Sequence, residues 1–217
     1  MGAISTARMP AQAGRNWLAL GAVAGPILFI VASFALAPTQ PGYSVVTRPV
    51  SALAIGPHGE YMRAAFLIDG LLVTAGVIAI FSRLGTQFGA VSRWIAPGLL
   101  LISPLGVLWA GIFTMDRLDL HNIGAQMALA TPVVTFPVVG LLLRRAPRWR
   151  RFGTLLMLGG PFTILLLVGF RTSVPLAELR SGMGGGLMGL WQRALGIEVL
   201  GWFVALGWLG SSRVVQG

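Results

Sequence analysis

Cysteine and lysine are both absent from this 217-residue chain, and carboxylate side chains number only six. Without cysteine the protein has no disulfide, no thiolate metal site and no cysteine nucleophile. Without lysine, the formal charge of +10 comes entirely from 16 arginines. Charged residues make up 10% of the chain and hydrophobic residues 55%, whereas soluble domains carry about 25% charged residues. The composition therefore excludes an ordinary soluble domain and predicts one membrane domain.

Six apolar runs are long enough to cross a bilayer, because about 20 residues at 1.5 Å each span a hydrocarbon core of roughly 30 Å. They predict an all-α, polytopic integral membrane bundle of about six transmembrane helices. The predicted spans are Trp17 to Ala37, Met62 to Leu84, Trp94 to Thr114, His121 to Leu143, Phe152 to Phe170 and Leu187 to Leu209. Prolines inside these runs, Pro132 among them, predict kinks and not breaks.

The first run also resembles a signal peptide, since two arginines precede it. It is 21 residues long, however, and Pro38 would follow the cleavage point, so we expect it to stay as the first span. The predicted organisation is a cytoplasmic N-terminal segment at 1–16, a six-helix transmembrane domain at 17–210 and a cytoplasmic tail at 211–217.

The arginines are distributed unevenly between alternate loops. The N-terminus, the second and fourth loops and the tail hold ten: Arg8, Arg15, Arg83, Arg93, Arg144, Arg145, Arg148, Arg150, Arg151 and Arg213. The first, third and fifth loops hold four: Arg48, Arg117, Arg171 and Arg180. Positive charge stays on the cytoplasmic side, so both termini are predicted to be cytoplasmic. The dense cluster lies between two spans, which favours a topological role and argues against nucleic-acid binding. Arginine without lysine indicates a bacterial source, hence the bacterial inner membrane.

Charged groups inside spans are costly and are functional candidates by default. Three stand out, namely Asp69, Arg193 and Glu198. Counted from the predicted span starts, Asp69 and Arg193 lie about 9 to 11 Å below the outer boundary, so the two side chains are at matching depth to form an ion pair. That pair would either bind substrate or only stabilise helix packing. Glu198 is predicted near mid-membrane, protonated or hydrogen-bonded.

Polar side chains concentrate in the predicted outer loops. Ser44 and Ser51 lie in the first loop, Asp116 and Asp119 in the third, and His121 at the start of the fourth span. A serine activated by His121, itself oriented by Asp116 or Asp119, would suit acyl transfer or lipid-ester hydrolysis, with Arg193 binding a phosphate or an oxyanion. The simpler interpretation assigns the serines to turns and the aspartates to helix capping. Two histidines without ligand spacing predict no metal, and nothing indicates a cofactor.

Several short motifs resemble a known family. They are Pro41-Gly42-Tyr43-Ser44, then Ser51, Leu53, Gly56 and Gly59, with Leu120-His121 and Gly189-Leu190-Trp191-Gln192-Arg193. In order and spacing this set resembles the bacterial membrane proteins called domain of unknown function 998, over roughly residues 17 to 210. A fainter similarity, from Pro41 to Ser51 and at His121-Asn122-Ile123-Gly124-Ala125, links the chain to the Frag1/DRAM/Sfk1 six-helix proteins. That second resemblance implies a function in membrane-lipid processing. The residues to test for such a function are Ser44, Ser51, His121 and Arg193.

Three functions remain open from the sequence. The first is binding or processing of a lipid or lipid-linked substrate at the outer leaflet, as a membrane-embedded lipid hydrolase or acyltransferase. The second is a non-catalytic scaffold or regulator with a membrane-protein partner, or a homo-oligomer. The third is small-solute or proton-coupled transport through Glu198. Membrane lipids are the expected partners in the first case.

Overall fold

The computed structural model describes residues 15–84, 89, 92–182 and 184–212, and every regular element in these ranges is helical. With η for 3₁₀ turns, the elements are η1 Trp17–Leu20, α1 Gly21–Leu36, η2 Ala37–Thr39, η3 Val50–Ala54, α2 Gly59–Leu84, α3 Ser92–Ile112, η5 Met115–Arg117, α4 Leu118–Leu129, α5 Pro132–Leu143, η6 Pro147–Trp149, α6 Arg150–Ser173, α7 Leu176–Ser181 and α8 Met188–Ser211. The predicted terminal segments 1–16 and 211–217 lie mostly outside the described residues.

Six helical segments of the described chain are long and apolar enough to cross a membrane, which confirms the predicted six-helix bundle. They are Trp17–Thr39, Gly59–Leu84, Ser92–Ile112, Met115–Leu143, Pro147–Ser173 and Met188–Ser211. The fourth and fifth begin earlier than predicted, because the turns η5 and η6 lead into them. Large apolar side chains such as Val31, Leu71 and Leu165 are exposed on the outside of the bundle, as lipid contact requires.

The fourth span is broken, where a kink was predicted. Its two helices, α4 and α5, are separated at Ala130 and Thr131, directly before Pro132. Proline has no N–H, so the carbonyl of Ala128, four residues earlier, loses its helical partner. The hydroxyl of Ser103 on α3 donates to that carbonyl over 2.8 Å. A neighbouring helix thus satisfies the backbone at the break.

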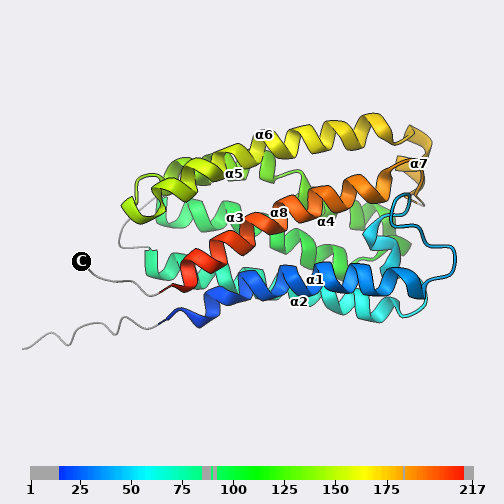
Figure 1. Ribbon diagram of the computed structural model, residues 1–217, viewed down its shortest axis with the longest axis horizontal. Helices are drawn as coiled ribbons and strands as arrows, with labels where there is room; N and C mark the ends of the chain where they lie inside the picture. The colour runs from blue at the N-terminus through cyan, green and yellow to red at the C-terminus, as the bar shows by residue number, and fades with distance from the viewer. Residues whose placement is uncertain (1–14, 85–88, 90–91, 183, 213–217) are drawn as a thin grey trace, which may run out of the picture.

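The spans form a closed ring. Neighbours in the ring are α1 and α2, α2 and α3, α3 and α4, α5 and α6, α6 and α8, and finally α8 and α1. The N–H of Asn16 donates to the carbonyl of Ser211 over 3.3 Å, so the first and last spans meet at one end. We call this the terminal end. The opposite end, with the first loop and α7, is the loop end (Figure 1).

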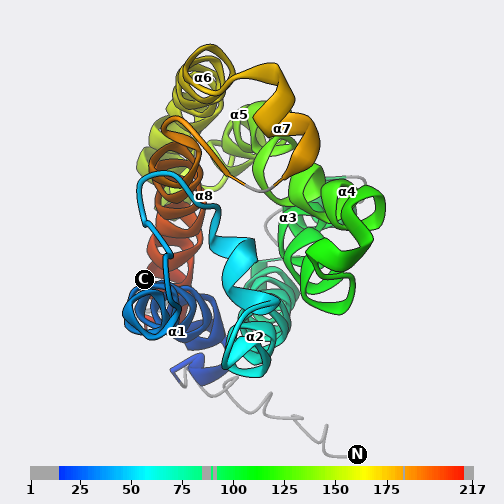
Figure 2. The ribbon, with the colours of Figure 1, turned by 90° about the vertical axis from the view of Figure 1, so that its right-hand side faces the viewer.

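The two halves of the ring are packed differently. Towards the terminal end, apolar side chains from all six spans fill the centre, with Phe136, Leu143, Trp149 and Phe203 almost fully buried. Glycines allow α1 and α2 to approach closely, since a Cβ on Gly21 would lie 2.5 Å from the carbonyl oxygen of Leu72. Towards the loop end, the turn η3 lies across the inside of the ring (Figure 2), and its Leu53 is fully buried. The first loop therefore covers one end of the bundle.

Candidate functional site

Arg193, at the start of α8, holds the first loop in place. One terminal nitrogen, Nη1, donates to the carbonyl of Val45 over 2.8 Å and to that of Arg48 over 3.2 Å. The other, Nη2, donates to the hydroxyl of Tyr43 over 2.7 Å, and this hydroxyl in turn donates to the carbonyl of Pro49 over 2.9 Å. Burial raises the pKa of Tyr43, against the opposing effect of Arg193, so the phenol stays protonated. The guanidinium thus clamps the loop through neutral acceptors.

The residues next to Arg193 complete this clamp. The side-chain oxygen of Gln192 accepts the N–H of Val50 over 2.6 Å, and the N–H of Leu190 donates to the carbonyl of Val46 over 3.0 Å. A Cβ on Gly189 would clash with the carbonyl oxygen of Arg48. The two sequence segments that carry the family resemblance therefore contact each other, and Gly189 is required because the loop backbone passes so close.

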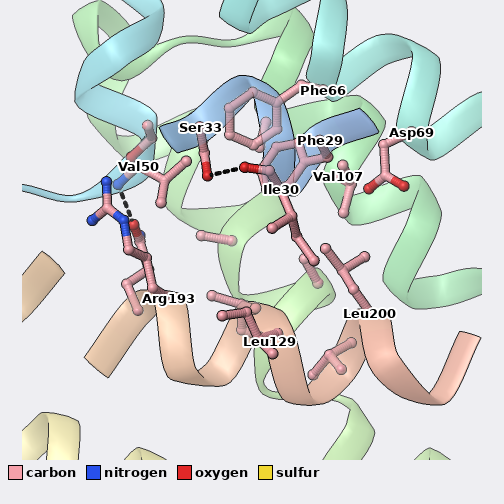
Figure 3. A pocket seen from close by; sticks show the side chains of 18 of the residues that line it. Phe29, Ile30, Ser33, Val50, Phe66, Asp69, Val107, Leu129, Arg193 and Leu200 are labelled. Atoms are coloured by element: carbon pink, nitrogen blue, oxygen red, sulfur yellow. Dashed lines mark hydrogen bonds between the residues drawn. The ribbon is translucent and has the colours of Figure 1, made fainter. Parts of the chain in front are cut away.

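A pocket lies beneath the first loop, between α1, α2, α3, α4 and α8 (Figure 3). Its empty volume is about 760 Å³, including the space at its mouth. Most of its wall is apolar and includes Phe29, Phe66 and Leu129. At its edge Phe34 and Ile197 are each 48% exposed on the outer surface of the bundle. The pocket thus reaches the outer surface of the bundle beside Phe34 of α1 and Ile197 of α8, the surface that faces the surrounding lipid.

Ser51 and His121 lie in this pocket wall and are both buried. The Nδ1 of His121 lies 2.8 Å from the carbonyl oxygen of Phe113 and 3.3 Å from that of Ala110. Carbonyl oxygens only accept, so Nδ1 carries the hydrogen and Nε2 has the free lone pair in the neutral ring. The Ser51 hydroxyl donates to the sulfur of Met115 over 3.1 Å.

A second pocket adjoins the first, on the far side of Ser51 and His121. It lies between α4, α6 and α8, under Gly182, and its wall includes Asn122 and Phe170. Both pockets share Ser51, His121, Ala125, Leu129 and Gln192. We call the two together the chamber. This space exists because α4 and α8 contact each other at only a few residues.

The predicted serine–histidine–aspartate relay is not assembled. Asp116 is exposed and accepts a hydrogen bond from Thr114, and the Nδ1 of His121 faces main-chain carbonyls instead of a carboxylate. The Ser44 oxygen accepts the N–H groups of Val46 and Thr47, each over 3.3 Å, as expected for a serine that stabilises a turn. Of the residues predicted as catalytic, the structure brings together Ser51 and His121 only.

The predicted ion pair between Asp69 and Arg193 is also not formed. Figure 3 shows the two side chains on opposite sides of the pocket. Counted from the observed helix starts, Asp69 lies about 15 Å along α2 and Arg193 about 8 Å along α8, so their depths differ. Glu198 is hydrogen-bonded, as predicted, by the indole N–H of Trp202 over 2.7 Å and by the hydroxyl of Thr163 over 3.0 Å.

Sequence reasoning missed Tyr43, Gln192 and Ser103 as individual groups. Both Tyr43 and Gln192 lie inside the motifs that carry the family resemblance. The signal that could have indicated Gln192 is its position next to Arg193 in the sequence. In the described part of the chain, no three His, Asp or Glu side chains gather as metal ligands would. The chamber therefore offers hydrogen-bonding groups within an apolar wall.

No curated protein and no solved structure matches this chain significantly. The link to the Frag1/DRAM/Sfk1 proteins stays a prediction. The family model described as "Protein of unknown function (DUF998)" matches residues 23–209, which include every described helix except η1, the first two residues of α1 and the last two of α8. A match over so much of the chain identifies this multi-pass membrane protein as a member of the DUF998 family.

Proposed function

We propose that this protein binds the hydrocarbon chain of a lipid or lipid-linked molecule in its chamber. The observation that carries the proposal is an apolar pocket inside the bundle whose edge, at Phe34 and Ile197, is exposed to the surrounding bilayer. An apolar pocket between the helices of a bundle, with a few polar groups in its wall, has the properties of ligand sites. Hydrocarbon from the bilayer is the ligand that such walls favour over water.

The polar groups of the chamber would contact the head of the bound molecule. Ser51, His121 and Gln192 lie where the two pockets meet, directly below the first loop. The arginine distribution predicts that the loop end is outside, so the lipid would enter from the outer leaflet. Because the relay needed for hydrolysis is not assembled, binding and not lipid-ester cleavage is the function proposed.

Gly196 allows a direct test. It lines the pocket, yet a Cβ placed on it would meet no atom within 4 Å. We therefore expect Gly196→Phe to place a ring at the edge of the pocket without displacing a neighbouring helix. Gly201→Phe is the matched control, since Gly201 lies on the same helix, is exposed and has equally open surroundings.

The measurement is photocrosslinking to a phospholipid with a diazirine in its acyl chain, in reconstituted bilayers. Peptide mapping of the wild type should find crosslinks on Val107 and Leu129, which are part of the pocket wall. Gly196→Phe should lose these crosslinks and Gly201→Phe should keep them. If crosslinks occur only on outward-facing residues, or both variants keep the internal ones, the proposal is wrong.

A further inference from the structure

Asp69 is a buried polar group that neither the clamp nor the helix packing explains. It lies on α2, is 1% exposed and lines the pocket. Its Oδ1 has no hydrogen-bond partner among the described residues. Buried polar groups in native proteins are almost always hydrogen-bonded, and an unpaired carboxyl among spans is costly. A group of this kind, on a pocket wall, indicates a ligand that supplies the missing partner.

The other polar groups around the pocket do not reach Asp69. Arg193 lies across the pocket, and both its terminal nitrogens donate to the first loop. The hydroxyl of Ser33 donates to the carbonyl of Ile30, and that of Ser103 to the carbonyl of Ala128, each over 2.8 Å. His121 contributes a lone pair at Nε2. No described side chain thus donates to the Oδ1 of Asp69, and a bound molecule would supply the missing donor.

The wall near Asp69 favours a positively charged donor. Phe66 precedes Asp69 by one helical turn, and its ring packs edge-to-face on Phe29, with the ring centroids 4.8 Å apart. Both rings line the same pocket as Asp69. Aromatic faces attract cations, and a carboxylate with aromatic neighbours is the combination that binds ammonium groups.

We propose that the chamber selects an amphiphile with a protonated amine, and that the Asp69 carboxylate accepts hydrogen bonds from this amine. This proposal rests on the proposed function, because the alkyl chain of the same molecule would occupy the apolar wall. Arg193, which donates to the first loop, would remain the clamp and would not bind the amine.

Three probes of equal chain length test the head group: dodecylamine, dodecan-1-ol and dodecanoic acid. Their binding to the purified full chain would be measured with radiolabelled probe in maltoside micelles. Wild type should bind the amine about tenfold or more tighter than the alcohol, since hydrogen bonds to charged groups contribute about 1.5–3 kcal/mol. Asp69→Asn should reduce amine affinity to that of the alcohol and leave alcohol affinity unchanged. Asp119→Asn, an exposed carboxylate outside the pocket, is the control.

Two outcomes would overturn the proposal and separate it from the proposed function. Equal binding of amine and alcohol, or an amine preference that survives in Asp69→Asn, shows that Asp69 does not recognise ammonium. If Gly196→Phe still abolishes binding of all three probes in that case, the lipid site stands and the amine specificity falls. If neither Gly196→Phe nor Asp69→Asn changes the binding of the probes, both the proposed function and the amine specificity are wrong.

Discussion

A single guanidinium determines the conformation of the first loop. Arg193 binds the carbonyls of Val45 and Arg48 and the hydroxyl of Tyr43, and stacks within 5.8 Å of the Phe34 ring centroid. Its planar group presents several donors in fixed directions, which the flexible ammonium of lysine does not. The clamp thus depends on the geometry of arginine and not on positive charge alone.

Arg193→Lys should therefore release the loop while keeping its charge. Hydrogen exchange at the amides of residues 44–48 and of Val50 should become about tenfold faster or more, because each hydrogen bond to a charged group contributes about 1.5–3 kcal/mol. Exchange followed by mass spectrometry in nanodiscs measures this. Arg171→Lys, at an exposed position of α6, is the control. Unchanged exchange in Arg193→Lys would show that the loop is held by its apolar contacts instead.

The sequence indicated the importance of Arg193 but not its partners. A charged residue inside an apolar run is visible from composition, because its burial is costly. Its acceptors are main-chain carbonyls of an irregular loop, and no periodicity encodes where those point. Asp69 and Arg193 were predicted at equal depth because hydropathy placed the start of the second span at Met62. In the structure α2 begins earlier, at Gly59, so Asp69 lies deeper than predicted. A helix start displaced by less than one turn is enough to invalidate such a pairing.

At the scale of elements, the break between α4 and α5 depends on a contact from another helix. Pro132 removes the N–H that the carbonyl of Ala128 would accept, and Ser103 replaces it. From the sequence we predicted a kink and not a break at this proline, and for Pro132 that prediction is wrong. That outcome depends on whether a neighbouring donor reaches the freed carbonyl.

Ser103→Ala should lower the free energy of unfolding by about 1–3 kcal/mol, because it leaves a buried carbonyl unpaired. In a Pro132→Ala background the backbone N–H returns, so the same serine substitution should cost much less. Denaturant unfolding of all four proteins in micelles gives the coupling. Ser82→Ala is the control, since its hydroxyl is exposed and bonds within its own helix. Additive effects of the two substitutions would contradict this account.

At the scale of the whole molecule, charge is separated between the two ends. The loop end carries all the carboxylates that lie outside the membrane interior, Glu60, Asp116, Asp119 and Glu178, together with five arginines once Arg63 is counted. The predicted cytoplasmic segments contain ten arginines and no carboxylate side chain. Hydropathy and charge alone therefore predict the six spans and their direction, because both depend on composition and not on tertiary contacts.

The predicted direction can be checked with single cysteines, since the chain has none of its own. Val46→Cys places a thiol in the first loop, where the side chain is exposed, and Gly89→Cys places one in the second loop, where a Cβ meets no atom within 4 Å. A membrane-impermeant maleimide applied to intact spheroplasts should label the first variant only. Permeabilisation should expose the second. Labelling in the reverse order would show that the loop end is cytoplasmic.

The closed ring of spans has a consequence for biosynthesis. The spans enter the membrane in chain order, yet α8 packs beside α1 and supplies Arg193 and Gln192 to the first loop. Until the last span is inserted, the carbonyls of Val45 and Arg48 lack their donor Arg193, and the N–H of Val50 lacks its acceptor Gln192. The pocket then has no wall on the α8 side. A nascent chain stalled before residue 188 thus lacks α8 in the ring and lacks the hydrogen bonds from α8 to the first loop. Membrane insertion of the final helix is the step that creates the chamber.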